Sequence, residues 1–160
     1  TAYVFMGICK SETVYGLAGN ALDPLAVAAI FETKNRPSFD PLIIHVASID
    51  EISTYCSEFP EPLRKLASAF WPGPLTLLLH KTSQIPDLVT SGLDRVAIRV
   101  PNHPQTLELL RSLDFPLAAP SPNPFGYRGK SKIAGSQLLK SASPRAFGKS
   151  LCAGQAFCFR

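Results

Sequence analysis

The sequence has no apolar stretch approaching the roughly 20 residues that a transmembrane helix requires, so we expect no membrane span. Residues 1–10 show neither a basic leader nor a small-residue cleavage site, and we expect no signal peptide. Only four cysteines occur, and none has the C-x-x-C spacing that is typical of zinc and redox sites. We therefore interpret the cysteines as reduced thiols and predict a cytoplasmic protein.

Acidic residues are missing from the last fifth of the chain. Residues 128–160 contain seven Lys and Arg but no Asp or Glu, whereas residues 1–127 contain nine and twelve respectively. The formal net charge of +4 thus combines −3 over the long part with +7 over the short part. The short part also has weak apolar periodicity. We predict a domain at residues 1–127 and an atypical or disordered basic segment at 128–160.

The chain is rich in apolar segments that alternate between strand-like and helix-like patterns. Its 160 residues, 46% of them hydrophobic, suffice for one globular domain with a substantial core. We predict strands at 3–9, 42–47, 75–80, 96–100 and 115–119, and helices at 23–34, 62–70 and 104–113, with a short helix after Ser48. This order predicts a single-domain α/β fold in which helices flank a twisted mixed β-sheet.

Residues 11–21 follow the first predicted strand, and we interpret them as a loop. Thr13 and Tyr15 lie there with Gly16 and Gly19, which permit close backbone approach. Ligands bind beyond strand ends in α/β sheets, so this composition fits a small-molecule cradle. An ordinary glycine-rich connection would have the same composition.

Two cations, Lys34 and Arg36, leave the end of a predicted helix just before a proline-fixed loop. Such a pair suits a polyphosphate, with Lys as a point charge and Arg as a planar fork. Alternatively, Lys34 simply complements the helix dipole. His45 lies inside the next predicted strand, where a single histidine is more often a core residue than a catalyst.

The last predicted strand runs into a loop with three prolines that carries Ser121 and Asn123. Their side chains can bind a phosphate or a ribose without charge, although a proline-rich turn is the simpler alternative. Residues 124–131 partly match the Walker A pattern. However, Pro124 replaces its first glycine and cannot donate the N–H that a phosphate nest requires, so we do not predict a P-loop.

Five motifs occur in an order that resembles the YrdC/YciO-type threonylcarbamoyl-AMP synthase family (TsaC-like). They are SETVYGLAGNA, KNRPSFDPLIIHV, FWPGPLTLLL, GLDRVAIRVPNHP and LAAPSPNPFG, over about residues 11–127. The resemblance implies a YrdC-like fold and a nucleotidyltransferase. The implied reaction converts ATP, L-threonine and bicarbonate into threonylcarbamoyl-AMP and pyrophosphate, for threonylcarbamoyl-adenosine modification of tRNA.

The same resemblance implies two sets of site residues. The first would bind L-threonine, with Arg99 pairing with its carboxylate: Thr13, Tyr15, His45 and Arg99. The second would bind ATP: Lys34, Arg36, Asp40, Ser121 and Asn123. Lys34 and Arg36 of this second set would also be the catalytic cations. Mg²⁺ would accompany ATP, and we expect no tightly bound protein metal.

The chain also departs from the family pattern. Asp40 replaces a usual Asn, Arg95 replaces a hydroxyl residue, and the family's later motifs are absent after residue 127. The acid-free segment 128–160 suits phosphate backbones, so the alternative hypothesis is a non-catalytic RNA-binding relative with the same fold. We also consider tRNA or downstream tRNA-modifying proteins as partners, and we expect no membrane partner.

Overall fold

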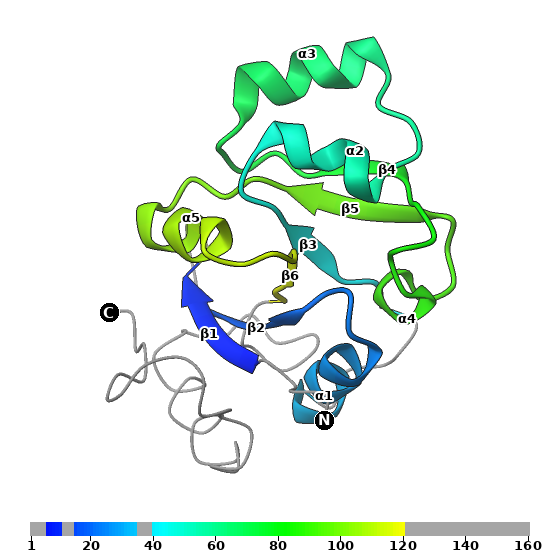
Figure 1. The fold of residues 1–160 in the computed structure, drawn as a ribbon, viewed down its shortest axis with the longest axis vertical. Helices are drawn as coiled ribbons and strands as arrows, with labels where there is room; N and C mark the ends of the chain where they lie inside the picture. The colour runs from blue at the N-terminus through cyan, green and yellow to red at the C-terminus, as the bar shows by residue number, and fades with distance from the viewer. Residues whose placement is uncertain (1–5, 11–14, 35–39, 121–160) are drawn as a thin grey trace.

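The computed structural model describes residues 6–10, 15–34 and 40–120, which form a six-stranded sheet with flanking helices (Figure 1). The strands are β1 (Met6–Lys10), β2 (Tyr15–Asn20), β3 (Ile43–His45), β4 (Leu77–His80), β5 (Arg95–Arg99) and β6 (Leu117–Ala118). The helices are α1 (Pro24–Lys34), the 3-10 turn η1 (Ile49–Glu51), α2 (Ile52–Tyr55), α3 (Glu61–Phe70), α4 (Asp87–Thr90) and α5 (Pro104–Arg111). Of these described helices, none has the length and apolar character that a membrane crossing would need.

The strand order across the sheet is β1-β2-β6-β3-β5-β4. β3 and β5 pair in parallel, and the other neighbouring strands pair antiparallel. The predicted mixed sheet in a single α/β domain is therefore confirmed. Figure 1 shows α3 at one end of the molecule, beyond β4 and β5, and α1 near the other end, beside β2.

The starts of α1 and η1 differ in whether the N-cap side chain forms a hydrogen bond. Asp23 precedes α1, and its Oδ1 accepts a hydrogen bond from the Leu25 N–H at 2.9 Å, as the sequence predicts for an N-cap. Ser48 is the N-cap of η1, but its side chain caps nothing. Glu51 Oε2 instead accepts from the Ala47 N–H at 3.3 Å. Ser48 and Glu51 have the spacing of a capping box, and only Glu51 forms a hydrogen bond, with the N–H one residue upstream of the N-cap.

The two faces of the sheet are covered unequally. One face carries the main core, to which the strands and α1, α2, α3 and α4 contribute: Leu17, Val27, Ile30, Ile44, Ile52, Ala67, Leu77, Leu79, Val89, Val96 and Ile98. On the other face, Leu110 of α5 packs on Ala18 of β2 and Leu117 of β6 in a smaller cluster. Ile43 of β3 and Leu78 of β4 remain 37% and 55% exposed.

The interpretation of residues 11–21 as a loop is wrong for its second half. Tyr15–Asn20 form β2, an interior strand that pairs with β1 on one side and β6 on the other. Its small side chains conceal the strand periodicity in the sequence. They also suit the position, because Ala18 is buried in the smaller core cluster together with Leu110. Helix α4 was likewise not predicted.

Candidate functional site

Most of the predicted site residues adjoin strand ends that share one end of the sheet, whereas His45 and Arg99 are the last residues of β3 and β5. β3 and β5 are parallel, and β6 is antiparallel to both β2 and β3. The starts of β2, β3 and β5 therefore lie at the same end as the finish of β6. Three groups of predicted site residues adjoin the sheet at this end. Thr13 precedes β2 and Tyr15 begins it, Lys34, Arg36 and Asp40 precede β3, and Ser121 and Asn123 follow β6.

The structure describes only part of the predicted threonine and nucleotide sites. Four of the predicted residues lie outside the described ranges: Thr13, Arg36, Ser121 and Asn123. Lys34 ends α1 and Tyr15 begins β2, and for these two only the backbone is described. Asp40 is half-buried on the approach to β3. The roles of all seven residues therefore stay predictions.

His45 and Arg99 are brought together by the parallel pairing of β3 and β5. They are direct partners in the register, and Leu117 of β6 lies opposite His45 on its other side. Neighbouring strands are about 4.8 Å apart, so the two side chains leave the same face as immediate neighbours. Two of the four residues predicted to bind threonine thus form one contiguous site.

The imidazole of His45 is held neutral by burial. The residue is 5% exposed, and desolvation lowers its pKa from 6.5 to about 4, which backbone groups of Leu117 and Ile43 partly offset. Its Nδ1 is buried and has no hydrogen-bond partner in the described part of the chain. A buried polar atom of this kind is normally satisfied, so the ring is suited to a hydrogen bond from a bound ligand.

Arg99 is oriented by the turn that precedes β4. Its Nε donates to the Gly73 carbonyl oxygen at 2.9 Å, and the Gly73 N–H donates to the Val100 carbonyl oxygen at 2.9 Å. Desolvation lowers the pKa of Arg99 from its usual value, which leaves the guanidinium charged at neutral pH because that usual value is high. A fixed guanidinium beside a neutral imidazole suits recognition of a carboxylate that carries a neighbouring polar group.

Gly73 orients the Arg99 side chain, because its carbonyl oxygen accepts the hydrogen bond from Arg99 Nε. A Cβ at this position would lie 2.2 Å from the Phe70 carbonyl oxygen, so the backbone would have to shift. We expect Gly73→Ala to lower the free energy of unfolding by about 2 kcal/mol through overpacking and to weaken ligand binding at Arg99. Chemical denaturation and L-threonine titration measure the two effects. Unchanged values in both, matching the exposed-site control Lys65→Ala, would contradict this role.

Sequence reasoning missed the surface that joins these residues, which we call the open face. It comprises Ile43, Leu78, Arg95, Ala97 and Arg99. The register places Leu78 and Ile43 on either side of Ala97, and Arg95 and Arg99 occupy the two ends of the same strand. The sequence RVAIR could have predicted this surface, because its apolar residues alternate with arginine and alanine and so mark one buried and one exposed face of the strand.

Carboxylates and thiols do not gather into a metal centre in the described part of the chain. There, no group of three or more His, Cys, Asp or Glu side chains is close enough to hold a metal ion. Cys56 is a buried free thiol whose pKa burial raises to about 12, so it is a poor ligand and nucleophile.

The chain matches the Sua5/yciO/yrdC family model, described as telomere recombination, over residues 6–142. The match extends past residue 127, while the predicted division at that residue stays a prediction. The threonylcarbamoyl-AMP synthase of Pyrococcus abyssi is 51% identical over 113 residues, covering 71% of this chain and 33% of the relative. That of Bacillus subtilis is 46% identical over 123 residues, covering 76% and 36%.

A solved structure shows the same fold. It is P. abyssi Sua5 complexed with L-threonine, which is 49% identical with a TM-score of 0.72. The match covers 74% of this chain and 35% of that one. The chain thus spans about a third of the length of these relatives.

Proposed function

Since the chain belongs to the Sua5/YciO/YrdC family, we propose that it carries out the synthesis of threonylcarbamoyl-AMP from ATP, L-threonine and bicarbonate. The observation that carries the proposal is the pairing of His45 with Arg99 on one face of the sheet. Arg99 is a fixed cation, and His45 is a neutral, buried imidazole. Together they suit an amino acid that binds through its carboxylate. The P. abyssi relative, whose structure holds L-threonine, supports this assignment.

In this proposal Arg99 binds the threonine carboxylate and His45 exchanges a hydrogen bond with the threonine hydroxyl or amino group. Thr13 precedes β2 and Tyr15 begins it, at the sheet end where β3 and β5 start, and both would contact the threonine from that side while His45 and Arg99 contact it from the other. Because His45 is neutral, it adds no charge that would compete with Arg99 for the carboxylate. We therefore expect the pocket to prefer a ligand that has one carboxylate and a polar side chain next to it.

The proposed reaction has two bond-forming steps. The threonine nitrogen bonds to the bicarbonate carbon, and water leaves to give a carbamate. A carbamate oxygen then attacks the α-phosphorus of ATP, and the bond to the bridging oxygen breaks, so that pyrophosphate departs with the electron pair. Negative charge develops on the phosphate oxygens, where the cations Lys34 and Arg36 would stabilise it.

Neutral hydrogen-bond donors and a divalent cation would complete the nucleotide site. Ser121 and Asn123 would contact it from the segment that follows β6. Mg²⁺ would neutralise the phosphates, and Asp40 offers a carboxylate of the type that Mg²⁺ accepts. An acid near phosphates is unfavourable without such a cation, so the presence of Asp40 fits a nucleotide that binds as its magnesium complex.

We expect pyrophosphate release from ATP to require both L-threonine and bicarbonate, because the carbamate is the nucleophile. A coupled phosphate assay with each substrate omitted in turn measures this requirement. Pyrophosphate formed from ATP alone at an undiminished rate would contradict the proposal. L-Valine, which replaces the hydroxyl by a methyl group, is the matched control and should give much slower release.

A wider role follows from the product. We propose that it serves modification of adenosine in tRNA, in the cytoplasm, with tRNA or tRNA-modifying proteins as partners. The competing hypothesis, a non-catalytic RNA-binding relative, is favoured by the net charge of +7 over residues 128–160. It predicts RNA binding that weakens steeply with salt, together with no pyrophosphate release.

A further inference from the structure

Ile43 and Ala97 lie next to the proposed threonine site. Ile43 is two residues before His45 on β3, and Ala97 is two residues before Arg99 on β5. Residues two apart on a strand share a face and are about 6.6 Å apart. The parallel register pairs Ile43 with Ala97 and His45 with Arg99. The four side chains therefore form two adjacent pairs on one face of the sheet, one polar and one apolar.

The apolar pair is accessible from the open face. In the register Ala97 lies between Ile43 of β3 and Leu78 of β4, and both of these neighbours are exposed although they are large and apolar. The side chain of Ala97 is a single methyl group, so the surface is lower at Ala97 than at Ile43 and Leu78. An apolar group of a bound ligand can therefore lie above Ala97 and contact Ile43.

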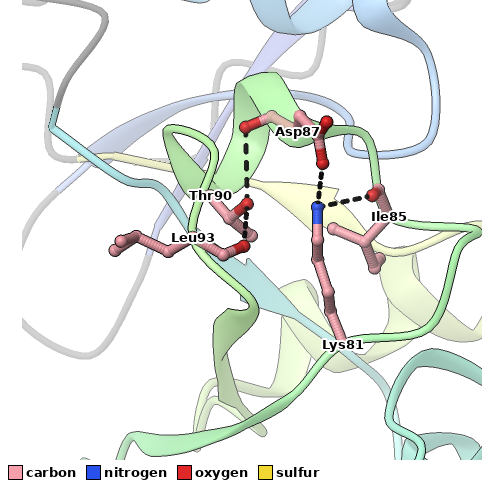
Figure 2. Close-up of polar contacts among 5 residues, drawn as sticks. All are labelled: Lys81, Ile85, Asp87, Thr90 and Leu93. Carbon is pink, nitrogen blue, oxygen red and sulfur yellow. Dashed lines mark hydrogen bonds and ion pairs between the residues drawn. The ribbon is translucent and has the colours of Figure 1, made fainter.

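The loop between β4 and β5 holds these two strands together. The Lys81 N–H donates to the Asp94 carbonyl oxygen at 3.0 Å, directly before β5. Figure 2 shows the Lys81 side chain within this loop, where its Nζ contacts Asp87 Oδ1 and lies 3.3 Å from the Ile85 carbonyl oxygen. The Lys81 side chain is largely buried, which strengthens both contacts. The spacing of β4 and β5 is therefore fixed at this end of the sheet.

Helix α4 connects the same loop to β3. Thr90 ends α4, and its hydroxyl lies 2.8 Å from the Leu93 carbonyl oxygen and 3.3 Å from that of Asp87 (Figure 2). The Val89 carbonyl oxygen accepts a hydrogen bond from the Leu42 N–H at 2.8 Å, one residue before β3. Val89, Thr90 and Leu42 are almost fully buried, so these bonds are shielded from water. One network thus joins β3, β4 and β5, as a site that distinguishes ligands by size requires.

The methyl group of threonine, which serine lacks, needs an apolar contact. In the proposed site Arg99 binds the carboxylate and His45 binds a polar group, so neither residue accounts for the methyl group. β3 has only three residues, and a ligand that is contacted from both ends of β3 therefore lies over Ile43. One additional methyl group that is buried against apolar surface changes affinity about tenfold.

We propose that Ile43 and Ala97 determine the preference for threonine over serine by contacting the methyl group of threonine, an inference that rests on the proposed function. Ile43 supplies the apolar surface, and the small side chain of Ala97 leaves the space. In this arrangement His45 binds the threonine hydroxyl. L-Allothreonine, in which the methyl and hydroxyl groups exchange places on the β-carbon, cannot make both contacts at once. The site therefore distinguishes both substituents of that carbon.

The test measures binding of L-threonine, L-serine and L-allothreonine to the whole chain by calorimetry, without ATP. Wild type is expected to bind threonine about tenfold more tightly than either analogue, and Ile43→Ala should reduce this ratio to about twofold. Ala97→Val fills the space, so threonine binding should weaken about tenfold while serine binding falls less. Valine is favoured in strands, so this variant should fold. Leu66→Ala is the matched control, because it removes a comparably exposed aliphatic side chain from α3.

Each outcome decides the roles of Ile43 and Ala97. An unchanged threonine-to-serine ratio in either variant, an equal change in Leu66→Ala, or wild type that binds threonine no better than serine would overturn them. A reduced ratio in Ile43→Ala and Ala97→Val, with no pyrophosphate release from wild type, would support the selectivity and refute the synthase. The two proposals therefore fail separately.

Discussion

Replacing Arg99 with alanine is expected to lower kcat/KM for L-threonine about a thousandfold, which corresponds to about 4 kcal/mol. In the proposed site the variant removes the cation that pairs with the substrate carboxylate, and the carboxylate would then be buried beside the neutral His45 without a partner. It also removes the Nε–H that donates to Gly73. Steady-state kinetics with varied threonine at saturating ATP and bicarbonate measure the loss.

Two comparisons separate recognition from structural damage. Arg99→Lys keeps the charge but loses the planar fork, so we expect activity between those of wild type and Arg99→Ala. The affinity for tripolyphosphate should stay unchanged in both variants, because that probe has no carboxylate for Arg99 to bind in the proposed site. An alanine variant with wild-type KM for threonine, or an equal loss of tripolyphosphate binding, would contradict the placement of the carboxylate.

Acidification is expected to destabilise the fold through His45 by about 3 kcal/mol, since one pKa unit is worth about 1.4 kcal/mol. The pKa of this histidine is about 4 in the folded chain, against 6.5 for the unfolded group. Between these values the unfolded state binds the proton and the folded state does not. Stability is therefore full above about pH 6.5 and is lost progressively as the pH falls towards 4.

Denaturant unfolding at several pH values between 4 and 7 tests this effect. His45→Gln removes the titrating ring, so the free energy of unfolding of this variant should fall less over the same range. His80→Gln is the matched control, because it removes a histidine from β4 whose side chain is half-exposed. Parallel curves for wild type and His45→Gln would show that the burial of His45 does not govern acid stability.

The sequence predicted the helices and strands that are marked by an N-cap residue or by a run of apolar residues. Asp23 gives the start of α1, and apolar runs locate β3, β4 and β5 to within one or two residues at most of their ends. β2 was missed because an interior strand made of glycine and alanine has no period of large side chains. Its identity depends on partners distant in the sequence, which local propensity does not encode.

The candidate site was predictable as a set of residues and not as an arrangement. Family resemblance named His45 and Arg99, but only the parallel register of β3 and β5 shows that they are neighbours. Arg95 looked like a departure from a pattern. Its position on the open face, at the other end of β5 from Arg99, follows from strand direction and register, which the sequence alone does not fix.

The most direct test of the proposed synthase is the fate of bicarbonate carbon. The chain is incubated with ATP, L-threonine and ¹³C-bicarbonate, and the nucleotides are analysed by mass spectrometry. We predict a threonylcarbamoyl-AMP species that carries the ¹³C label and accumulates in step with pyrophosphate. A nucleotide product without the label, or ADP and phosphate as the sole products, would contradict the account.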